Sequence, residues 1–403
     1  MRHEPAQRAD LYYDPYDYEI DKDPHTVWKR LREERPVYFN ERYEFFALSR
    51  FEDVWRAYHE PRIYSSSHGV QLETLDRPAE YPAMIFMDPP EHDSLRKLVS
   101  RAFTPARVRH LEESVGRLVD GLLDPLAGAS DFDYVADFGA LLPPMVIGEL
   151  LGVPTADHDQ LRLWFDELLH REENQEQIGE RAMTAGLAVF EYTQGMLAER
   201  RARPREDMIT ALMQAEIPDG EGDGTRRLDE IEIVSFIVLL AGAGVETVAR
   251  LLSWTAVLLA RHPDQRELLT ADPSLIPNAI EELLRYEAPS PVNGRWLTQP
   301  VTVQGITIPA ESKVLLLNGS ADRDPREFAD PDRFDVRREI GRHAAFGFGT
   351  HFCLGAALAR LEGRIALLGT LRRFPTWDID ERTLRPVHTS TVRGFSSVPV
   401  HLG

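Results

Sequence analysis

The spacing of apolar residues divides the chain into a long helical stretch and shorter stretches with strand composition. From about residue 90 to about residue 290, apolar residues recur every three or four positions, the period of an amphipathic helix. The predicted helices cover residues 25–34, 51–59, 90–102, 107–126, 138–152, 157–170, 174–202 and 206–215. The predicted strands cover 37–39, 45–48, 301–303, 306–308 and 313–317, with strand and loop over 387–402. The pattern predicts a mainly α fold with small β-sheets.

Two polar segments interrupt this pattern. Residues 65–83 are polar and irregular, and we interpret them as a candidate mobile loop over a pocket. Residues 217–226 are acidic and rich in glycine, which predicts a second loop. No fixed-period repeat and no linker is visible, so the chain is predicted to form one domain.

One long helical pattern runs from Leu228 to Arg261. At ~1.5 Å per residue it has a length of roughly 50 Å, enough to cross a domain. Gly242 and Gly244 lie inside it, and a glycine in a helix interior costs about 1 kcal/mol relative to alanine. Close approach to a cofactor is one reason to accept that cost. The alternative is an ordinary kinked helix with Glu246 on its surface.

Composition narrows the possible partners and compartments. The net charge is 46 − 66 = −20, which argues against nucleic acid or an anionic membrane surface as a partner. One cysteine allows no internal disulfide and fits a reducing cytosol. Residues 1–23 lack the apolar core of a signal peptide or membrane anchor, and the longest apolar run, 233–245, is shorter than the roughly 18 residues of a span. We therefore expect a soluble, cytoplasmic protein.

The single cysteine, Cys353, lies in a loop that contains three glycines within residues 346–355. Glycines let a backbone turn tightly and approach a flat or bulky group. An apolar helical stripe begins at Leu354, so the cysteine lies near a helix N-terminus, where backbone N–H groups favour a thiolate. A small buried hydrophobe is the plainer interpretation of a lone cysteine. A thiolate held in a glycine-rich loop suits axial ligation of haem iron.

The loop reads Phe-x-x-Gly-x-x-x-Cys-x-Gly and resembles the haem-binding signature of the cytochrome P450 family. The resemblance implies one domain over 1–403 that binds haem b. Its helix-rich core would span about 90–290, its small β-sheet segments about 36–48, 295–318 and 376–402, and its haem-ligand loop 346–355. The implied iron ligand is Cys353. Implied haem contacts in the loop and the following helix are Phe346, Gly347, His351, Cys353, Leu354, Gly355 and Ala359.

The resemblance also implies partners for the two haem propionates, which need cationic or hydrogen-bonding groups. His92 and Arg96 are four residues apart on one predicted helix and match the family's pair. Arg295 matches the arginine that follows the family's Glu-x-x-Arg helix, and His351 precedes the cysteine by two residues. Each of these residues alone is more often a solvated surface group. The remaining implied haem contacts are Asn293, Ala243 and Gly244.

Two further motifs match the family. Glu246 and Thr247 in the long helix resemble its acid–alcohol pair, which relays protons to iron-bound dioxygen. Glu282 and Arg285 have the spacing of its buried ion pair, and Arg333 would be the arginine that engages that pair. The plain alternative is an ordinary surface pair worth a few tenths of a kcal/mol. The resemblance thus gives the first two residues a catalytic role and the other three a structural one.

The substrate pocket is expected to have mostly apolar walls, so a hydrophobic substrate is predicted. The variable loop around Met84 and residues of three other segments would line it. They are Ile85, Phe86, Leu239, Ala243, Val292 and Phe395. A lipid, terpenoid, steroid, polyketide or aromatic compound would fit, and the sequence does not choose among them.

The implied reaction is that of a haem-thiolate monooxygenase, which places one atom of O₂ in an organic substrate and releases the other as water. Three alternatives stay open. A haem-binding sensor would need no proton relay, and peroxide-driven relatives usually replace the acid–alcohol pair that this chain keeps. A cysteine hydrolase would need a histidine base, and His351 lies on the wrong side of a tight loop from Cys353.

Electrons are expected from a separate ferredoxin and its reductase, because no flavin domain is evident in the chain. Several cations oppose the global negative charge in the segments predicted to surround the cysteine loop. They are Lys97, Arg101, Arg107, Arg109, Arg342, Arg360 and Arg364. Such a local positive patch would steer an acidic partner, although each residue alone is more often a solvated one.

Overall fold

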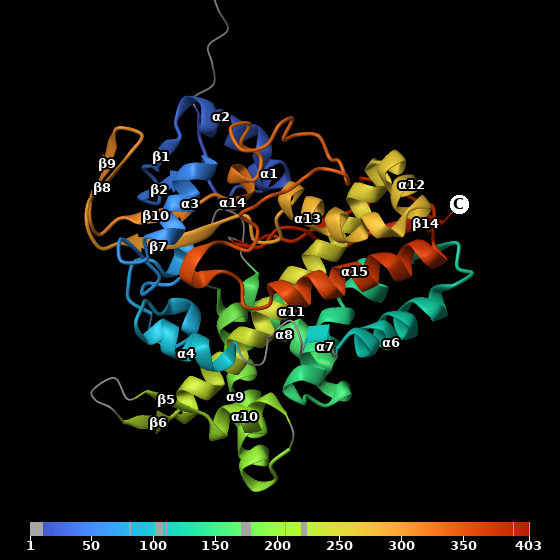
Figure 1. Ribbon diagram of the computed structural model, residues 1–403, viewed down its shortest axis with the longest axis horizontal. Coiled ribbons are helices and arrows are strands. Elements are labelled where there is room, and N and C mark those ends of the chain that lie inside the picture. Colours follow the sequence, from blue (N-terminus) through green and yellow to red (C-terminus); the bar gives the residue numbers. More distant parts are fainter. Residues whose placement is uncertain are drawn as a thin grey trace, which may run out of the picture.

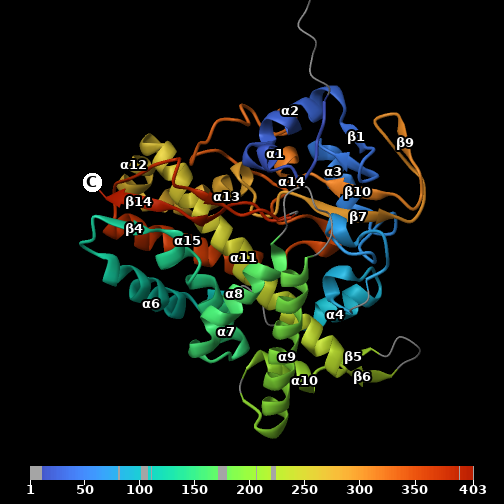
Figure 2. The same ribbon diagram turned by 180° about the vertical axis from the view of Figure 1, so that it is seen from behind.

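The computed structural model describes residues 11–79, 82–100, 108–109, 111–170, 179–205, 207–218, 224–389 and 391–402. Figures 1 and 2 show helices through most of the molecule and a sheet region at one end. The α-helices are α1 Tyr18–Lys22, α2 Pro24–Glu34, α3 Phe51–His59, α4 Glu91–Val99, α6 Glu112–Leu123, α7 Leu142–Leu151, α8 His158–Leu169, α9 Glu180–Ala202, α10 Met208–Gln214, α11 Glu230–Arg261, α12 Pro263–Ala271, α13 Ile276–Tyr286, α14 Asn318–Ala321 and α15 Ala356–Arg373. The predicted mainly α class with small sheets is confirmed.

The longest helix, α11, organises the core. Its first turn has a capping box, in which the Asp229 side chain accepts the Glu232 N–H and the Glu232 side chain accepts the Asp229 N–H, both at 2.8 Å. It ends at Arg261, before Pro263 begins α12. Its 32 residues span about 48 Å. α11 runs through the middle of the molecule with α15 packed against it (Figures 1 and 2).

The two glycines of α11 admit side chains from neighbouring helices. A Cβ on Gly242 would lie 2.9 Å from the Phe165 ring of α8, and a Cβ on Gly244 would lie 2.6 Å from Ile147 of α7. Contacts this short do not occur for real Cβ atoms, so glycine is required at both positions for these helices to pack. Helix packing is therefore a second reason for this pair beside the predicted approach to a cofactor, and Gly244 also borders the large cavity described below.

The largest sheet has the strand order β1-β2-β10-β7-β3 and lies beside the N-terminal helices (Figure 1). Its strands are β1 Val37–Asn40, β2 Phe45–Leu48, β3 Tyr64–Ser65, β7 Asn293–Leu297 and β10 Lys313–Leu316. β10 pairs with β2 in parallel, and the other three pairings are antiparallel. Val314 lies between Phe46 and Arg295 in this register, so the sheet fixes the position of Arg295.

The remaining strands form small sheets. They are β4 Asp131–Asp133, β5 Glu216–Pro218, β6 Thr225–Arg227, β8 Val301–Val303, β9 Ile306–Ile308, β11 Trp377–Ile379, β12 Arg385–Pro386, β13 Phe395–Ser397 and β14 Pro399–Leu402. β8 and β9 match the strands predicted over 301–303 and 306–308, and they form a hairpin around Gln304 and Gly305. The loop predicted over 217–226 was wrong in part, because its ends pair as β5 and β6.

Among the described residues, α11 is the one helix with the length and apolar composition of a membrane span. Sixty-one per cent of its most apolar 18-residue window is buried inside the fold. Its apolar character is therefore accounted for by the packing of the core.

Candidate functional site

The cysteine loop is shaped by two glycines in the left-handed region. Gly347 has φ 63° and Gly349 has φ 62°, conformations that L side chains rarely adopt. A Cβ on Gly349 would also lie 2.5 Å from the Tyr58 carbonyl oxygen, so the loop packs closely against α3. The Cys353 N–H donates to the Phe346 carbonyl oxygen at 2.9 Å and closes the loop ahead of α15.

Burial raises the pKa of the Cys353 thiol, and a backbone N–H at Gly355 and the charges of Arg96 and Arg360 act against it. The N–H group at the helix N-terminus thus favours the thiolate as predicted, but desolvation outweighs it together with the nearby positive charges. A coordinated metal ion deprotonates a thiol outright. The environment of Cys353 is therefore suited to a metal-bound thiolate more than to a free one.

Cys353 borders a cavity of about 280 Å³ between the loop, α4, α11, β7 and α15. The structure brings most of the sequence-predicted site residues to this one cavity. They are Ile85, His92, Arg96, Leu239, Ala243, Gly244, Thr247, Asn293, Arg295, Phe346, Gly347, His351, Cys353, Leu354, Gly355 and Ala359. Residues that come from six separate segments of the chain thus share one space.

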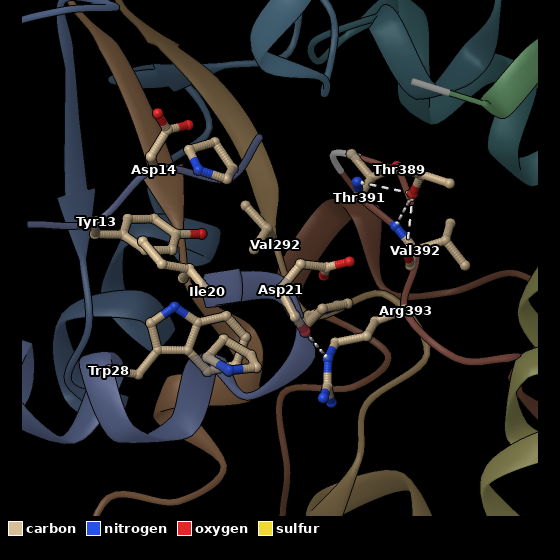
Figure 3. Close-up of a pocket in the computed structure, with 13 residues that line it drawn as sticks. Tyr13, Asp14, Ile20, Asp21, Trp28, Val292, Thr389, Thr391, Val392 and Arg393 are labelled. Atoms are coloured by element: carbon tan, nitrogen blue, oxygen red, sulfur yellow. Dashed lines mark hydrogen bonds between the residues drawn. The ribbon is translucent and has the colours of Figure 1, made fainter. Parts of the chain in front are cut away.

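Three predicted pocket residues do not border this cavity. Phe86 is absent from its wall, and Phe395 packs edge-on against Trp254 with ring centroids 4.8 Å apart. Val292 points instead into a cavity of about 20 Å³ between the N-terminal segment and the loop before Arg393 (Figure 3). That space suffices for about one water molecule. For Val292 and Phe395 the prediction was wrong because the side chain packs against other neighbours, and for Phe86 because the residue is not on the wall.

The cavity wall contains a buried cation that lacks an anionic partner among the described residues. The Arg295 side chain is 4% exposed and donates to the Gly294 carbonyl oxygen at 2.7 Å. Its guanidinium lies 5.2 Å from the centroid of the Tyr58 ring. No carboxylate of the described residues is within ion-pair distance of it. Because buried charges in proteins are normally paired, this arginine fits a site for an anionic ligand group.

Two histidines lie beside that arginine. The His92 and His351 rings are 4.3 Å apart, and His92 Nε2 is buried with no hydrogen-bond partner in the described part of the chain. Burial, and then the charges of Arg295 and other neighbours, lower the pKa of His351 to about 2. Burial also lowers the pKa values of His92 and Arg96. These groups and Arg295 fit the two carboxylates of a haem, and Cys353 fits its iron.

The predicted acid–alcohol pair is split by the geometry of α11. Thr247 borders the cavity, and its hydroxyl donates to the Ala243 carbonyl oxygen at 2.7 Å. Glu246 is 3% exposed and does not border the cavity. Its carboxylate accepts from Arg250 at 2.7 Å, and Arg250 also donates to the Phe395 carbonyl oxygen at 2.6 Å. Glu246 is therefore held in a buried ion pair with Arg250, whereas Thr247 faces the cavity.

The Glu-x-x-Arg pair is fully buried. Arg285 donates to both Glu282 oxygens, at 2.6 and 2.8 Å, and to the carbonyl oxygens of Asp322 and Pro331, both at 2.9 Å. The predicted third member, Arg333, offers only its carbonyl oxygen, at 3.4 Å.

The Arg333 side chain is 67% exposed and lies 3.5 Å from Asp335. Arg338 takes the role predicted for Arg333, since its Nε donates to Glu282 at 3.2 Å. The earlier assignment was wrong because both arginines lie at plausible distances in sequence, and the path of the loop after α13 decides between them.

Among the wall residues that the sequence did not predict, one is acidic. Glu362 of α15 borders the cavity and is 1% exposed. Gly355, Ala359 and Glu362 are spaced by four and three residues, so they lie on one helical face. That spacing could have added Glu362 to the predicted haem contacts.

The predicted positive patch is smaller than the sequence indicated. Arg342 pairs with Glu327 at 2.9 Å, and Arg360 pairs with Glu281 at 2.7 Å. Lys97 and Arg109 are exposed, and Arg364 is partly exposed. The other two members, Arg101 and Arg107, lie outside the described residues.

Comparisons with known proteins agree with this geometry. The family model described as Cytochrome P450 matches residues 36–274 and 271–400. A cytochrome P450 of Mycobacterium bovis is 41% identical over 395 residues, 97% of each chain. A steroid C26-monooxygenase of Mycobacterium tuberculosis is 37% identical over 386 residues, 94% of each chain. The crystal structure of CYP109E1 from Bacillus megaterium in complex with testosterone has a TM-score of 0.87 at 31% identity, and the match covers 96% of this chain and 99% of that one.

Proposed function

The chain belongs to the cytochrome P450 family of monooxygenases, and from that premise we propose that it oxidises a hydrophobic small molecule with one atom of O₂. The observation that carries the proposal is the meeting of Cys353, Thr247 and the buried, unpaired Arg295 at one largely apolar cavity. When haem b is bound there, its iron supplies the activation of dioxygen. The whole described chain then acts as one haem domain.

The residues around the haem position hold it and exclude water. Cys353 Sγ is the iron ligand. Arg295, His92, Arg96 and His351 bind the propionates, and Asn293 adds a hydrogen bond. Because Arg295 and His92 are buried, their hydrogen bonds to the anionic propionates would form in a low dielectric and be stronger than in water. Gly347 and Gly349 keep the cysteine loop close to the haem, since larger residues would strain it.

Thr247 is the polar group of α11 that faces the reaction space. Its hydroxyl proton is engaged by the Ala243 carbonyl oxygen, which leaves the oxygen lone pairs available to accept from a water in the cavity. Glu246 would take part in proton transfer only after its contact with Arg250 loosens. We infer that Thr247 positions water and protons within the cavity. Glu246 acts from the side of α11 that does not border the cavity.

The substrate is inferred to be an extended apolar molecule, and a steroid is the class we favour. The apolar lining of the cavity includes Val70, Met84, Ile85, Phe236, Leu239 and Leu240. The name of the steroid C26-monooxygenase and the testosterone bound to CYP109E1 support this class. A panel of steroids, terpenoids and fatty acids, tested for shifts of the haem absorption band, would identify the class that binds.

The absorption spectrum of the purified protein tests the proposal. Reduced and treated with carbon monoxide, it should show the long-wavelength Soret band of a thiolate-ligated haem. Cys353→Ser should lose that band while the chain stays folded, because the change removes one sulfur atom from a loop shaped by its glycines. Retention of the same band in Cys353→Ser would overturn the assignment.

Electrons are proposed to come from a small acidic ferredoxin and its reductase, in a cytoplasmic setting. Lys97, Arg109 and Arg364 remain as candidate contacts near the thiolate side, and the net charge elsewhere is strongly negative. Reduction by a ferredoxin should slow as salt rises, since exposed charges are screened over ~8 Å at physiological ionic strength.

Stopped-flow reduction gives the test of this surface. Lys97→Glu should slow reduction about 3- to 10-fold at low salt and leave substrate binding unchanged, in line with the loss of electrostatic steering. Arg382→Glu is the matched control, because Arg382 is exposed and lies beyond the far end of α15. Equal rates for both variants, independent of salt, would place the docking surface elsewhere.

A further inference from the structure

Three segments around the cysteine loop meet at one carboxylate, that of Glu281 on α13. Both of its oxygens accept from Arg360 of α15, each at 2.7 Å. His343, three residues before Phe346, contacts the same carboxylate through Nε2 at 3.1 Å. Glu281 thus joins α13, α15 and the segment that leads into the cysteine loop, and the proposed function does not yet use it.

The hydrogen bonds of this cluster define its charge. His343 Nδ1 accepts the Ala345 N–H at 3.2 Å, so we assign a neutral ring whose Nε2–H donates to Glu281. Burial acts to raise the pKa of Glu281, but the hydrogen bonds from Arg360 and His343 outweigh burial and lower this pKa to about 2. Glu281 is therefore an ionised carboxylate that balances the single positive charge of Arg360.

Arg360 lies beside the iron ligand proposed above. Its guanidinium carbon is 4.5 Å from the centroid of the Phe346 ring, and the Phe346 carbonyl oxygen accepts the Cys353 N–H at 2.9 Å. Burial raises the pKa of Cys353, and the charges of Arg96 and Arg360 act against burial. Arg360 therefore stabilises negative charge on the sulfur, and a carboxylate that balances Arg360 weakens this effect.

We propose that Glu281 is a positioning residue that holds and neutralises Arg360, and thereby keeps the Cys353 thiolate a strong electron donor and the haem reduction potential low. This inference rests on the proposed haem-thiolate function. Reduction adds one electron, so uncompensated positive charge near the sulfur favours the reduced form. With Glu281 in place the pair has no net charge. Without it, one positive charge remains beside the cysteine loop.

Glu281→Gln tests the proposal through the reduction potential of the haem-loaded protein, measured from its absorption spectrum in the presence of redox dyes. Glutamine keeps the size of the side chain and its accepting oxygen but removes the charge. The reduction equilibrium should shift at least about 3-fold toward the reduced form, which is about 28 mV at 59 mV per tenfold.

A second measurement reports electron donation by the thiolate. In the reduced protein treated with carbon monoxide, the infrared C–O stretch of Glu281→Gln should move to a higher frequency than in the wild type. The physical reason is that a thiolate that donates less leaves less electron density to pass into the antibonding orbital of carbon monoxide.

Glu327→Gln is the matched control. Glu327 makes the same two-bond contact with Arg342, at 2.9 and 3.0 Å, and the two pairs are exposed to nearly the same extent. Arg342 lies over aromatic rings of α3, and it is not one of the charged groups of the described residues that act on Cys353. The control removes the same charge from the protein, so it should shift the equilibrium less than about 1.5-fold.

Arg360→Gln gives the opposite prediction and keeps the proposal testable should Glu281→Gln fail to load haem. It leaves Glu281 unbalanced, so the equilibrium should shift at least about 3-fold toward the oxidised form. The double variant, Glu281→Gln with Arg360→Gln, should return to within about 1.5-fold of the wild type, because the two residues act as one pair. A merely structural role would not give shifts of opposite sign.

An unchanged or lower reduction potential in Glu281→Gln would overturn the proposal. So would equal shifts in Glu281→Gln and Glu327→Gln, or shifts of the same sign in Glu281→Gln and Arg360→Gln. A wild-type protein without the long-wavelength carbon monoxide band would instead refute the proposed function itself, so the two failures are distinguishable.

Discussion

Two buried arginines lie within the same fold in opposite electrostatic settings. Arg285 is fully buried, and it donates to the Glu282 carboxylate and to backbone carbonyl oxygens around it. Arg295 is almost as buried, but its recorded hydrogen-bond acceptor is the carbonyl oxygen of its neighbour Gly294. Arg285 belongs to a structural cluster, whereas Arg295 has no anionic partner among the residues that the structure describes.

This difference shows how a ligand-binding site can be distinguished from a structural cluster of charged residues without reference to the ligand. Burying a charge is costly unless it is paired and hydrogen-bonded. A fold that retains an incompletely paired cation such as Arg295 therefore gains from it when something else binds. Variants in the two regions test this difference. Those around Arg285 should affect folding, and those at Arg295 should affect haem binding.

The largest effect is expected from Glu282→Ala. Removing this carboxylate leaves Arg285 and Arg338 without their shared acid, and breaking a buried pair costs about 3–5 kcal/mol of unfolding free energy. Urea unfolding, followed by circular dichroism, measures the loss, and haem incorporation should fall with it. A loss below about 1 kcal/mol would show that the cluster around Arg285 does not have a structural role.

Arg295→Met should have a smaller effect, and on haem affinity alone. Loss of charged hydrogen bonds to a propionate should weaken haem binding by about 1.5–3 kcal/mol. The haem-free protein should be as stable as the wild type or more stable, because the change removes a buried, unpaired charge. Haem titration and unfolding of the haem-free protein give the two values. Equal destabilisation of the haem-free and haem-bound forms would contradict the assignment of Arg295 to haem binding.

The smallest effect distinguishes two arginines near Glu282. Arg338→Met should lower the unfolding free energy by about 1.5 kcal/mol, the value of one hydrogen bond to a charged group. Arg333→Met should change it by less than about 0.5 kcal/mol, since that side chain is exposed. Paired urea titrations give both numbers, and the reverse order would restore the assignment made from sequence.

Local signals in the sequence were sufficient for elements whose ends are set by neighbouring residues. The helix predicted over 51–59 is α3, and the hairpin around Gln304 and Gly305 has the predicted strands. The long helix was predicted within two residues of its start, because a capping box and Pro263 mark its ends. The cysteine loop was recognisable because its glycines are required by backbone conformation, which depends on a few adjacent residues.

Only the tertiary structure decided which distant groups meet. Sequence distance allowed either Arg333 or Arg338 to reach Glu282, and the loop path selected Arg338. Helical spacing placed Glu246 beside Thr247, yet packing turned one to Arg250 and the other to the cavity.

The sequence by itself determined the periodicity of the helices, the shape of the cysteine loop and the residue types available for chemistry. The facing of Glu362, the neighbours of Gly242 and the unpaired state of Arg295 came from long-range packing. The physical reason is that conformation along the chain is governed by nearby residues, whereas burial and pairing depend on segments that fold together from far apart.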